Sequence, residues 1–247
     1  GQANRIQQGF RGEDVPLFVS QMIKIIVEHP NIDVIAGAEI KSVAGCAGNF
    51  TTALSDGREV RHGAAIIATG GAEYRPCEYL YGQNNRVLTL LELENALTGQ
   101  EPEVIGARTV VLIQCVGSRE PGRMYCSRVC CTKSVSLALS LKARDPGIRV
   151  YVLYRDLRTY GFYEDLYREA RSKGVIFIRY ETGAKPVVQA AGEGLKVTVT
   201  DHILRRPLEI PADIVGLAAA TVAPEENRRL AHLFRVPLNE DGFFHEA

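Results

Sequence analysis

The sequence has 247 residues, of which 46% are hydrophobic and 23% are charged. This balance is typical of a soluble globular protein and excludes a disordered chain. Lysine plus arginine and aspartate plus glutamate both number 29, so the chain lacks the excess positive charge with which proteins bind nucleic acid or anionic lipid. We therefore expect no nucleic-acid partner.

The apolar runs of the sequence are short. Those at 63–68 and 214–220 are far below the roughly 20 residues that a membrane-spanning helix needs. Residues 1–15 are polar and do not resemble a signal peptide. We expect a cytoplasmic protein without a transmembrane segment. In a reducing compartment, crowded cysteines are more often metal ligands or redox groups than structural disulfides.

The first hundred residues predict a helix followed by β-structure. Apolar residues recur at helical spacing over residues 15–29, with Pro16 in the first turn and Pro30 beyond the end, which predicts an amphipathic helix packed on a core. Residues 64–71 predict a short buried strand that ends in a glycine turn. A small β-meander is predicted from the runs 32–36, 39–43, 50–54 and 59–60.

After about residue 100, predicted strands and helices alternate. Strands are expected at 109–115, 149–154 and 175–180, and helices at 127–143 and 163–172. Such alternation with short connections predicts an α/β fold with a parallel, Rossmann-like sheet that helices cover on its faces. The remaining expected elements are a hairpin-like pair at 186–189 and 195–200, strands at 208–210 and 214–219, and a helix near 225–234.

The turn after the first of these strands lacks the usual dinucleotide signature. A Rossmann unit normally has glycines there, because the backbone must approach a pyrophosphate at the helix start. Here the turn reads Cys115-Val-Gly-Ser-Arg119, and no Gly-x-Gly-x-x-Gly occurs anywhere in the chain. Arg155 and Asp156 follow the second strand, where a ribose-reading residue would lie, but a charged strand end is usually only solvated. The sequence indicates a nucleotide-binding scaffold whose phosphate cradle is replaced by cysteines.

Four of the six cysteines, Cys115, Cys126, Cys130 and Cys131, lie within seventeen residues. If the helix begins near Ser127, Cys126 and Cys130 are about one turn apart on one face, and Cys131 lies roughly 100° round. Cys115, at the strand end, faces the same helix start. Four thiolates can therefore converge where backbone N–H groups and the positive helix end stabilise their charge.

Several kinds of site fit four converging sulfurs. A zinc ion or an iron–sulfur cluster takes four thiolates. Zinc sites usually pair their ligands as two C-x₂₋₄-C motifs, so the adjacent Cys130 and Cys131 after a long gap favour a 4Fe-4S cluster. A Cys126/Cys130 redox dithiol and inert buried thiols remain alternatives.

Other residues near these cysteines are ambiguous. Arg119, Arg123 and Arg128 are either solvated surface or stabilise the negative charge of a cluster. The isolated Cys46 and Cys77 are interpreted as structural.

Four motifs of this chain resemble one known family. They are Gln114-Cys-Val-Gly-Ser-Arg119, Tyr125-Cys-Ser-Arg-Val-Cys-Cys131, the segment 154–161 and the segment 236–244. Together they resemble the flavin and iron–sulfur A subunit of heterodisulfide reductase and its relatives in anaerobes. The resemblance implies a thioredoxin-reductase-like core. It also implies that Cys115, Cys126, Cys130 and Cys131 ligate a 4Fe-4S cluster in the region where thioredoxin reductase binds NADPH.

The first hundred residues are similar to the FAD-binding half of the same fold. Residues 29–32, 48–50 and 66–70 match family segments, and the resemblance implies that Ala68, Thr69, Gly70 and Gly71 approach FAD. The glycine fingerprint for the FAD pyrophosphate, the family's closing Gly-Asp segment and the ferredoxin motifs are absent from this sequence. We therefore expect an incomplete flavin site and a chain that is a fragment, or a subunit whose flavin site is completed elsewhere.

These patterns predict three regions. They are a partial FAD-binding-like domain at 1–105, an NAD-domain-like α/β domain with the cysteines at 106–222, and a return segment at 223–247. The expected function is electron transfer through a 4Fe-4S cluster to a flavin or to other redox subunits of a complex. No catalytic residue is predicted, and the oxidoreductase would be active only within a complete chain or complex. A homodimer is also compatible with the sequence. A zinc-stabilised scaffold that docks partners and a dithiol oxidoreductase are the rival functions.

Overall fold

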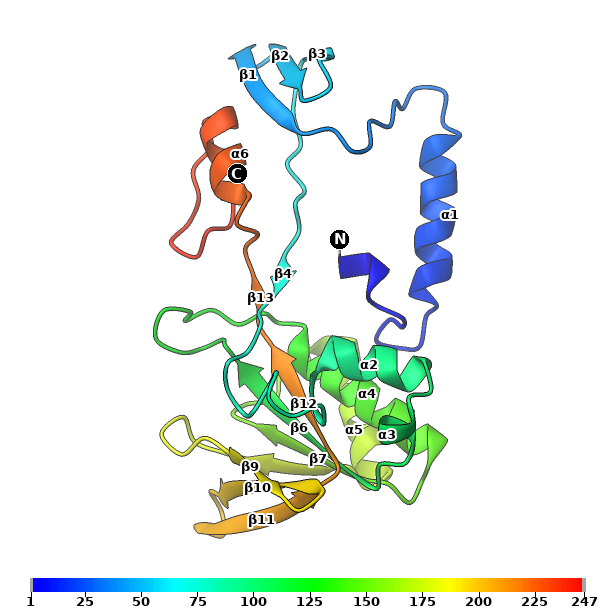
Figure 1. The fold of residues 1–247 in the computed structure, drawn as a ribbon, viewed down its shortest axis with the longest axis vertical. Helices are drawn as coiled ribbons and strands as arrows, with labels where there is room; N and C mark the ends of the chain where they lie inside the picture. Colours follow the sequence, from blue (N-terminus) through cyan, green and yellow to red (C-terminus); the bar gives the residue numbers. More distant parts are fainter. Residues whose placement is uncertain (1, 246–247) are drawn as a thin grey trace. The chain divides into compact units, whose positions relative to one another are not determined.

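A computed structural model describes residues 2–245, which form two compact units (Figure 1). Unit 1 comprises residues 17–72 and 222–245, and unit 2 comprises residues 2–16 and 73–221. Residues 73–105, which we expected in the partial FAD-binding-like domain, thus lie in unit 2. Residue 1 and residues 246–247, at the ends of the expected first and last regions, lie outside the described residues. The assignment of either unit to a nucleotide stays a prediction.

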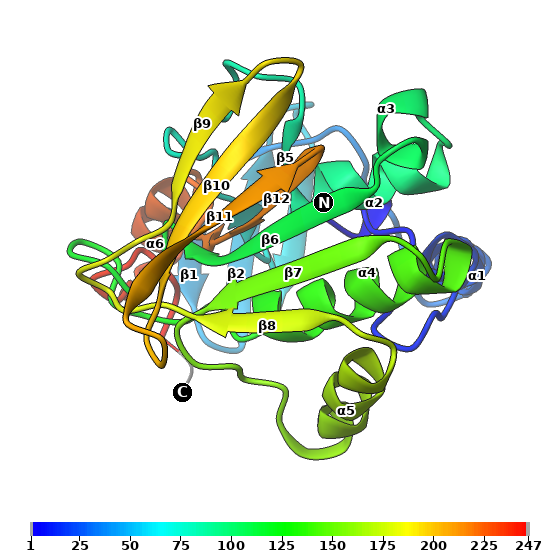
Figure 2. The same ribbon diagram turned by 90° about the horizontal axis from the view of Figure 1, so that it is seen from below.

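Unit 2 contains the parallel sheet that the sequence predicts. Its strand order is β5 (Val87–Thr89), β12 (Ile214–Ala219), β6 (Thr109–Val116), β7 (Arg149–Tyr154) and β8 (Ile176–Arg179). All neighbouring strands are parallel, and Figure 2 shows them side by side. Every residue of β6 is buried, as expected for a strand that is covered on both faces of a parallel sheet. The predicted α/β fold is confirmed.

The two faces of this sheet are covered by different structures. Along β6, Val110 and Leu112 pack with the helices, whereas Val111 and Ile113 pack on the opposite side, because side chains alternate along a strand. The helices are α2 (Leu90–Thr98), α3 (Pro102–Ile105), α4 (Cys130–Arg144) and α5 (Glu164–Ser172). The opposite face is covered by an antiparallel sheet of β9 (Val187–Ala191), β10 (Gly194–Asp201) and β11 (Arg206–Ala212). The prediction that helices cover both faces of the sheet is therefore wrong.

Some elements of unit 2 differ from the predicted ones. Strand β5, helix α2 and helix α3 were not expected. Thr89 and Glu92 form a capping box at the start of α2, and this Thr-x-x-Glu pattern is the sequence signal that marks the helix. Helix α4 begins at Cys130 rather than near Ser127, so Cys126 lies in the preceding loop and not on the helix face. A 3₁₀ turn, η2 (Gly161–Tyr163), precedes α5.

Unit 1 contains the predicted β-meander. Strands β1 (Ile40–Cys46), β2 (Asn49–Leu54) and β3 (Glu59–His62) pair in antiparallel order, and helix α6 (Asn227–Phe234) follows later in the chain. Arg229 of α6 donates a hydrogen bond to the Ile40 carbonyl at 2.6 Å. Short strands β4 (Ala72–Glu73) and β13 (Thr221–Val222) pair at two of the points where the chain passes from one unit to the other. A 3₁₀ turn, η1 (Gln2–Asn4), starts the described chain.

Three predictions for the first part of the chain are wrong. Helix α1 (Val15–Val27) forms, but none of its residues is buried, and Phe18 is 61% exposed, so the helix does not pack on a core of described residues. Residues 64–71 form no strand, and Ile66 is 94% exposed, because no described segment pairs with this run. Residues 32–36 also form no strand.

None of the helices in residues 2–245 combines the length and hydropathy that a membrane crossing requires.

Candidate metal centre

The four predicted cysteines meet at the carboxyl end of β6. Cys115 lies in β6, Cys126 lies in the loop that follows, and Cys130 and Cys131 are the first residues of α4. All six pairs among these thiols are close enough to interact electrostatically, and all four thiols are free. Within residues 2–245, no group of three or more His, Cys, Asp or Glu side chains has the arrangement needed to hold one metal ion. The role of the four cysteines as metal ligands stays a prediction.

Burial disfavours ionisation of these thiols. Together with the charges of the neighbouring thiolates, which contribute less, burial raises the pKa of Cys130 to about 12 and that of Cys131 to about 11. Burial also raises the pKa of Cys115, against the opposing effect of the Arg119 and Arg155 charges. A bound cation would offset this cost, since thiolates are the form that ligates a metal. The chemistry of the donor set therefore fits a metal or an iron–sulfur cluster.

The backbone around Cys115 is unusual. Cys115, Gly117 and Arg119 have positive φ angles of 62°, 71° and 58°. The register between β6 and β12 shifts at this point, as in a β-bulge, which redirects a side chain away from the regular sheet. A left-handed conformation costs a non-glycine residue about 1–3 kcal/mol. The turn therefore holds Cys115 and Arg119 in backbone conformations that a regular strand does not provide.

Gly117 is required by a close contact in the same turn. A Cβ atom there would lie 2.2 Å from the ring of Tyr74. Arg123 stacks on that ring at 4.2 Å and donates a hydrogen bond to the Gly117 carbonyl at 2.7 Å. The contacts of Arg123 are thus with the turn, whereas Arg119 lies beside a sulfur.

Each sulfur lies beside a hydrogen-bond donor. The donors are Arg119 Nη1 for Cys115 at 4.0 Å, the Arg128 N–H for Cys126 at 3.3 Å, the Ser127 hydroxyl for Cys130 and the Arg158 N–H for Cys131. Such donors orient thiolate ligands and stabilise their charge. The start of α4 adds its own positive partial charge near Cys130 and Cys131.

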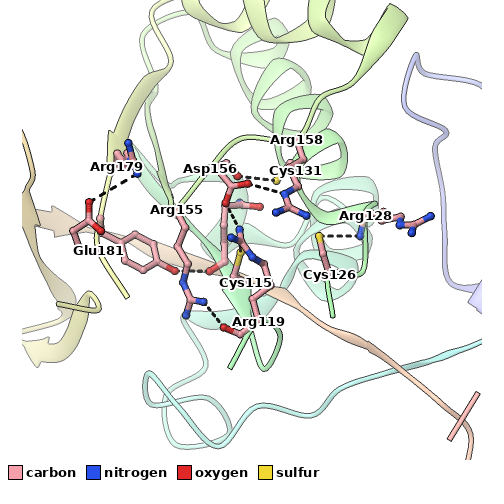
Figure 3. Close-up of polar contacts among 12 residues, drawn as sticks. Cys115, Arg119, Cys126, Arg128, Cys131, Arg155, Asp156, Arg158, Arg179 and Glu181 are labelled. Atoms are coloured by element: carbon pink, nitrogen blue, oxygen red, sulfur yellow. Dashed lines mark hydrogen bonds and ion pairs between the residues drawn. The ribbon is translucent and has the colours of Figure 1, made fainter. Parts of the chain in front are cut away.

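The segment after β7 completes the surroundings of the cysteines, which the sequence did not reveal. Arg155 is 6% exposed, donates to the Arg119 carbonyl at 2.6 Å and pairs with Glu120 at 3.0 Å. Asp156 pairs with both Arg119 and Arg158 (Figure 3). The interpretation of this strand end as solvated is wrong for Arg155, whereas the Asp156 side chain is 44% exposed and is held by its two ion pairs. The available signal was their position, since the carboxyl ends of adjacent parallel strands share one edge of a sheet.

Positive charges lie near two of the four thiols. The charges of Arg119 and Arg155 act on Cys115, and that of Arg158 interacts with Cys126. Arg155 Nε is buried and has no hydrogen-bond partner among the described residues. A cluster with four thiolate ligands carries negative charge, and these guanidinium groups complement it. The residues present therefore fit a 4Fe-4S cluster.

An apolar cavity of about 490 Å³ lies beside Cys130 within unit 2. Residues of five separate segments line it, among them Phe10, Leu90, Lys133 and Ala220. The sequence carries no pattern for this cavity, because its walls come from segments that only the fold brings together.

The predicted flavin contacts lie in unit 1. Ala68, Thr69, Gly70 and Gly71 form an irregular segment between β3 and β4. The Thr69 hydroxyl donates to Asn227 Oδ1 at 2.8 Å, so this side chain is held by α6. Gly70 has a φ of 70°, and the space where its Cβ would lie is open. The segment is thus free of side-chain bulk at Gly70, and its role in FAD binding stays a prediction.

No family model matches this sequence. The chain is 37% identical over 209 residues to the CoB–CoM heterodisulfide reductase iron-sulfur A subunit 1 of Methanopyrus kandleri, a match that covers 74% of this chain and 30% of that protein. It is also 37% identical over 206 residues to the CoB–CoM heterodisulfide reductase iron-sulfur A subunit of Methanocaldococcus jannaschii, covering 76% of this chain and 31% of that protein. The chain therefore spans about 30% of the length of these curated relatives.

Solved structures share the fold. The thioredoxin reductase of T. acidophilum matches with a TM-score of 0.57 and 14% identity, over 99% of this chain and 72% of that one. The ornithine N-hydroxylase of Kutzneria sp. 744 matches with a TM-score of 0.55 and 11% identity, over 94% of this chain and 67% of that one. Over about three quarters of its length, this chain is thus a homologue of the heterodisulfide reductase A subunit, on a thioredoxin-reductase-like fold.

Proposed function

We propose that this chain is an electron-transfer module of a heterodisulfide-reductase-like flavin and iron–sulfur oxidoreductase, in which Cys115, Cys126, Cys130 and Cys131 hold a 4Fe-4S cluster. One observation carries the proposal: four thiols from β6, the loop after it and the start of α4 converge at one sheet end, beside arginines and backbone donors. The names of the relatives, which are iron-sulfur subunits, support it. When bound, such a cluster supplies one-electron oxidation and reduction.

The residues of this chain would shield and orient the cluster. Cys115 and Cys131 are buried, which limits the access of water to their sulfurs. The Arg128 and Arg158 N–H groups would fix the positions of Cys126 and Cys131. Arg119 and Arg155 would balance part of the negative charge near Cys115.

The partners and the flavin follow from the relatives. We propose that electrons pass between this site and other redox subunits, because the relatives are subunits of reductases named for the CoB–CoM heterodisulfide. The proposed setting is cytoplasmic and anaerobic, and a homodimer remains part of the proposal. The chemistry at the final substrate would belong to a complete chain or complex.

FAD would contact Ala68, Thr69, Gly70 and Gly71. The sequence has no Gly-x-Gly-x-x-Gly, so the main pyrophosphate contact is missing and this chain alone should bind FAD weakly. Titration of the chain with FAD, followed by flavin fluorescence, measures the affinity. Tight binding of one FAD per chain would show that these residues suffice.

Iron content after anaerobic reconstitution tests the metal. We expect close to four irons per chain, since four thiolates match the ligand demand of the cluster. Cys130→Ser should lose most of the iron, whereas Cys46→Ser is the matched control, because Cys46 is exposed and lies in β1 of unit 1. Stoichiometric zinc without iron would instead favour the partner-docking scaffold.

A redox titration distinguishes a cluster from a dithiol. The cluster should titrate as a one-electron couple with an electron paramagnetic resonance signal in one state. A Cys126/Cys130 disulfide would titrate as a two-electron couple whose potential falls as pH rises, since reduction takes up protons. A two-electron transition without a paramagnetic signal would contradict the proposed cluster.

A further inference from the structure

Asp156 joins two arginines that surround the cysteines. Its carboxylate pairs with Arg119 Nη1 through one oxygen and with Arg158 Nε through the other, the latter at 2.7 Å (Figure 3). Its pKa is lowered: burial acts to raise it, but hydrogen bonds from Arg158 and Arg119 outweigh that effect. Both ion pairs are half-buried, so water competes with them less than at an open surface.

The two arginines reach the sulfurs from opposite segments. Arg119 Nη1 lies 4.0 Å from Cys115 Sγ, and the backbone N–H of Arg158 donates to Cys131. The charge of Arg158 also interacts with Cys126. A single carboxylate thus links the turn after β6 to the segment after β7, at the point where both touch the cysteine group.

The chain constrains Arg119 on its other side as well. Its φ of 58° is left-handed, and its N–H donates to the Tyr125 carbonyl at 3.1 Å. Its carbonyl accepts a hydrogen bond from Arg155 Nη1 at 2.6 Å. The backbone of Arg119 is therefore held in an unfavourable conformation that returns its side chain toward Cys115, and Asp156 restrains the far end of that side chain.

We infer that Asp156 is a positioning residue that holds the Arg119 and Arg158 guanidinium groups near Cys115 and Cys126 and thereby raises the reduction potential of the site. The inference rests on the proposed function, because it concerns the potential of the cluster that the cysteines would hold. Uptake of one electron makes the site one charge more negative, and nearby positive charge stabilises that form. Arginine stays protonated at all accessible pH values. The electron therefore goes to the site alone, and Arg119, Asp156 and Arg158 neither transfer a proton nor form or break a covalent bond.

Reduction potentials of reconstituted variants test this inference. The titration uses a low-potential dye as reductant, and iron and sulfide are measured first in every sample. Arg119→Gln should shift the ratio of oxidised to reduced sites roughly tenfold toward the oxidised form, which for a one-electron couple is about 59 mV lower. The matched control is Arg179→Gln, which removes the same charge from an arginine paired with Glu181 at 3.9 Å. It should shift the ratio less than about twofold, because the Arg179 side chain is 47% exposed and solvent screens its charge.

Asp156 variants separate positioning from simple charge. If Asp156 acted only through its own negative charge, Asp156→Asn would raise the potential. Because Asp156 holds two positive groups, we expect Asp156→Asn to lower the potential. The ratio of oxidised to reduced sites should shift roughly threefold toward the oxidised form, since the freed guanidinium groups move into water. Asp156→Glu retains the carboxylate and should restore a potential close to that of the original chain.

The outcomes are distinguishable from a failure of the proposed function. An original chain that takes up no iron would contradict the cluster itself and this inference with it. Full iron in all variants, with equal shifts for Arg119→Gln and Arg179→Gln, would overturn this inference alone. A raised potential in Asp156→Asn would do the same. If Asp156→Asn does not fold, Arg119→Gln and Asp156→Glu still decide the question.

Discussion

Units 1 and 2 bury their apolar residues to very different extents. In unit 2 the parallel sheet has one apolar core on each face, and side chains such as Leu93, Leu112 and Leu217 are fully buried. Among the described residues of unit 1, Leu54 is the one apolar side chain that is buried. Large apolar residues of α1, including Phe18 and Ile25, are exposed. A sequence pattern that predicts a buried face thus succeeds only where the fold supplies a partner for that face.

The contrast also concerns the candidate sites. The cysteines of unit 2 sit on a buried strand end with strained turns and paired arginines around them. The segment 68–71 of unit 1 is irregular and half-exposed or exposed. Local stability follows burial, so unit 2 should be the more rigid scaffold. Paired substitutions, one in each unit, measure how far this difference extends.

The largest expected effect is the loss of a core side chain. Leu112→Ala removes a leucine that is fully buried between α2 and the sheet, and it should lower the free energy of unfolding by about 2–5 kcal/mol. Leu17→Ala makes the same chemical change on α1, where the side chain is 53% exposed, and should cost less than about 1 kcal/mol. Urea denaturation followed by circular dichroism measures both. Equal losses would mean that α1 is buried to the same extent as β6.

The next effect is the loss of a buried ion pair. Lys133 of α4 pairs with Glu94 of α2, with side chains 12% and 7% exposed, and donates to the Gln8 carbonyl at 3.1 Å. Lys133→Ala leaves the Glu94 carboxylate buried without a cation, so we expect a loss of about 3 kcal/mol. Lys24→Ala removes the exposed pair between Lys24 of α1 and Glu28, the residue after this helix, and should change stability by less than about 0.5 kcal/mol. A negligible loss for Lys133→Ala in thermal unfolding would indicate that water reaches Glu94.

Two glycines test the strain at the candidate site. Both Gly117 and Gly57 have positive φ, so alanine costs about 1 kcal/mol at either position. At Gly117 the new Cβ also meets the Tyr74 ring, whereas at Gly57 nothing lies within 4 Å. Gly117→Ala should therefore cost about 1–3 kcal/mol more than Gly57→Ala, as for overpacking elsewhere, and it should reduce iron uptake. Equal stabilities of the two variants in urea would show that Tyr74 moves aside without cost.

The smallest effect concerns a helix start. The Thr89 hydroxyl accepts a hydrogen bond from the Glu92 N–H at 3.3 Å, and the Glu92 carboxylate accepts one from the Thr89 N–H at 2.8 Å. Thr89→Ala removes this cap of α2 and should cost about 1 kcal/mol. In α1 the exposed Ser20 hydroxyl donates to the Leu17 carbonyl at 2.8 Å, and Ser20→Ala should change stability by less than about 0.5 kcal/mol because alanine favours the helix. Urea denaturation again measures both variants. A loss of unfolding free energy for Ser20→Ala as large as that for Thr89→Ala would contradict the expected difference between the two helices.

Much of unit 2 could be predicted from the sequence by itself. The runs that become β6, β7, β8 and β12 are apolar throughout or nearly so, and this pattern is local. The grouping of four cysteines after β6 could also be predicted, because the turn and the helix that follow keep them within a short span of chain. The likeness to the A subunit of heterodisulfide reductase is carried by the same motifs, and the curated relatives confirm it.

Only the tertiary structure decided what lies against these elements. The hairpin at β9 and β10 reads as an ordinary pair of strands, and its packing against the sheet depends on contacts between residues far apart in the chain. The apolar stripe of α1 is present in the sequence, but burial requires an opposing surface, which a local pattern does not contain. Arg155, Asp156 and Arg158 look like solvated charges after a strand, and the adjacency of β6 and β7 brings them to the cysteines. Local patterns determine the elements, whereas the partners of a charge or an apolar face are set by segments that only the fold brings together.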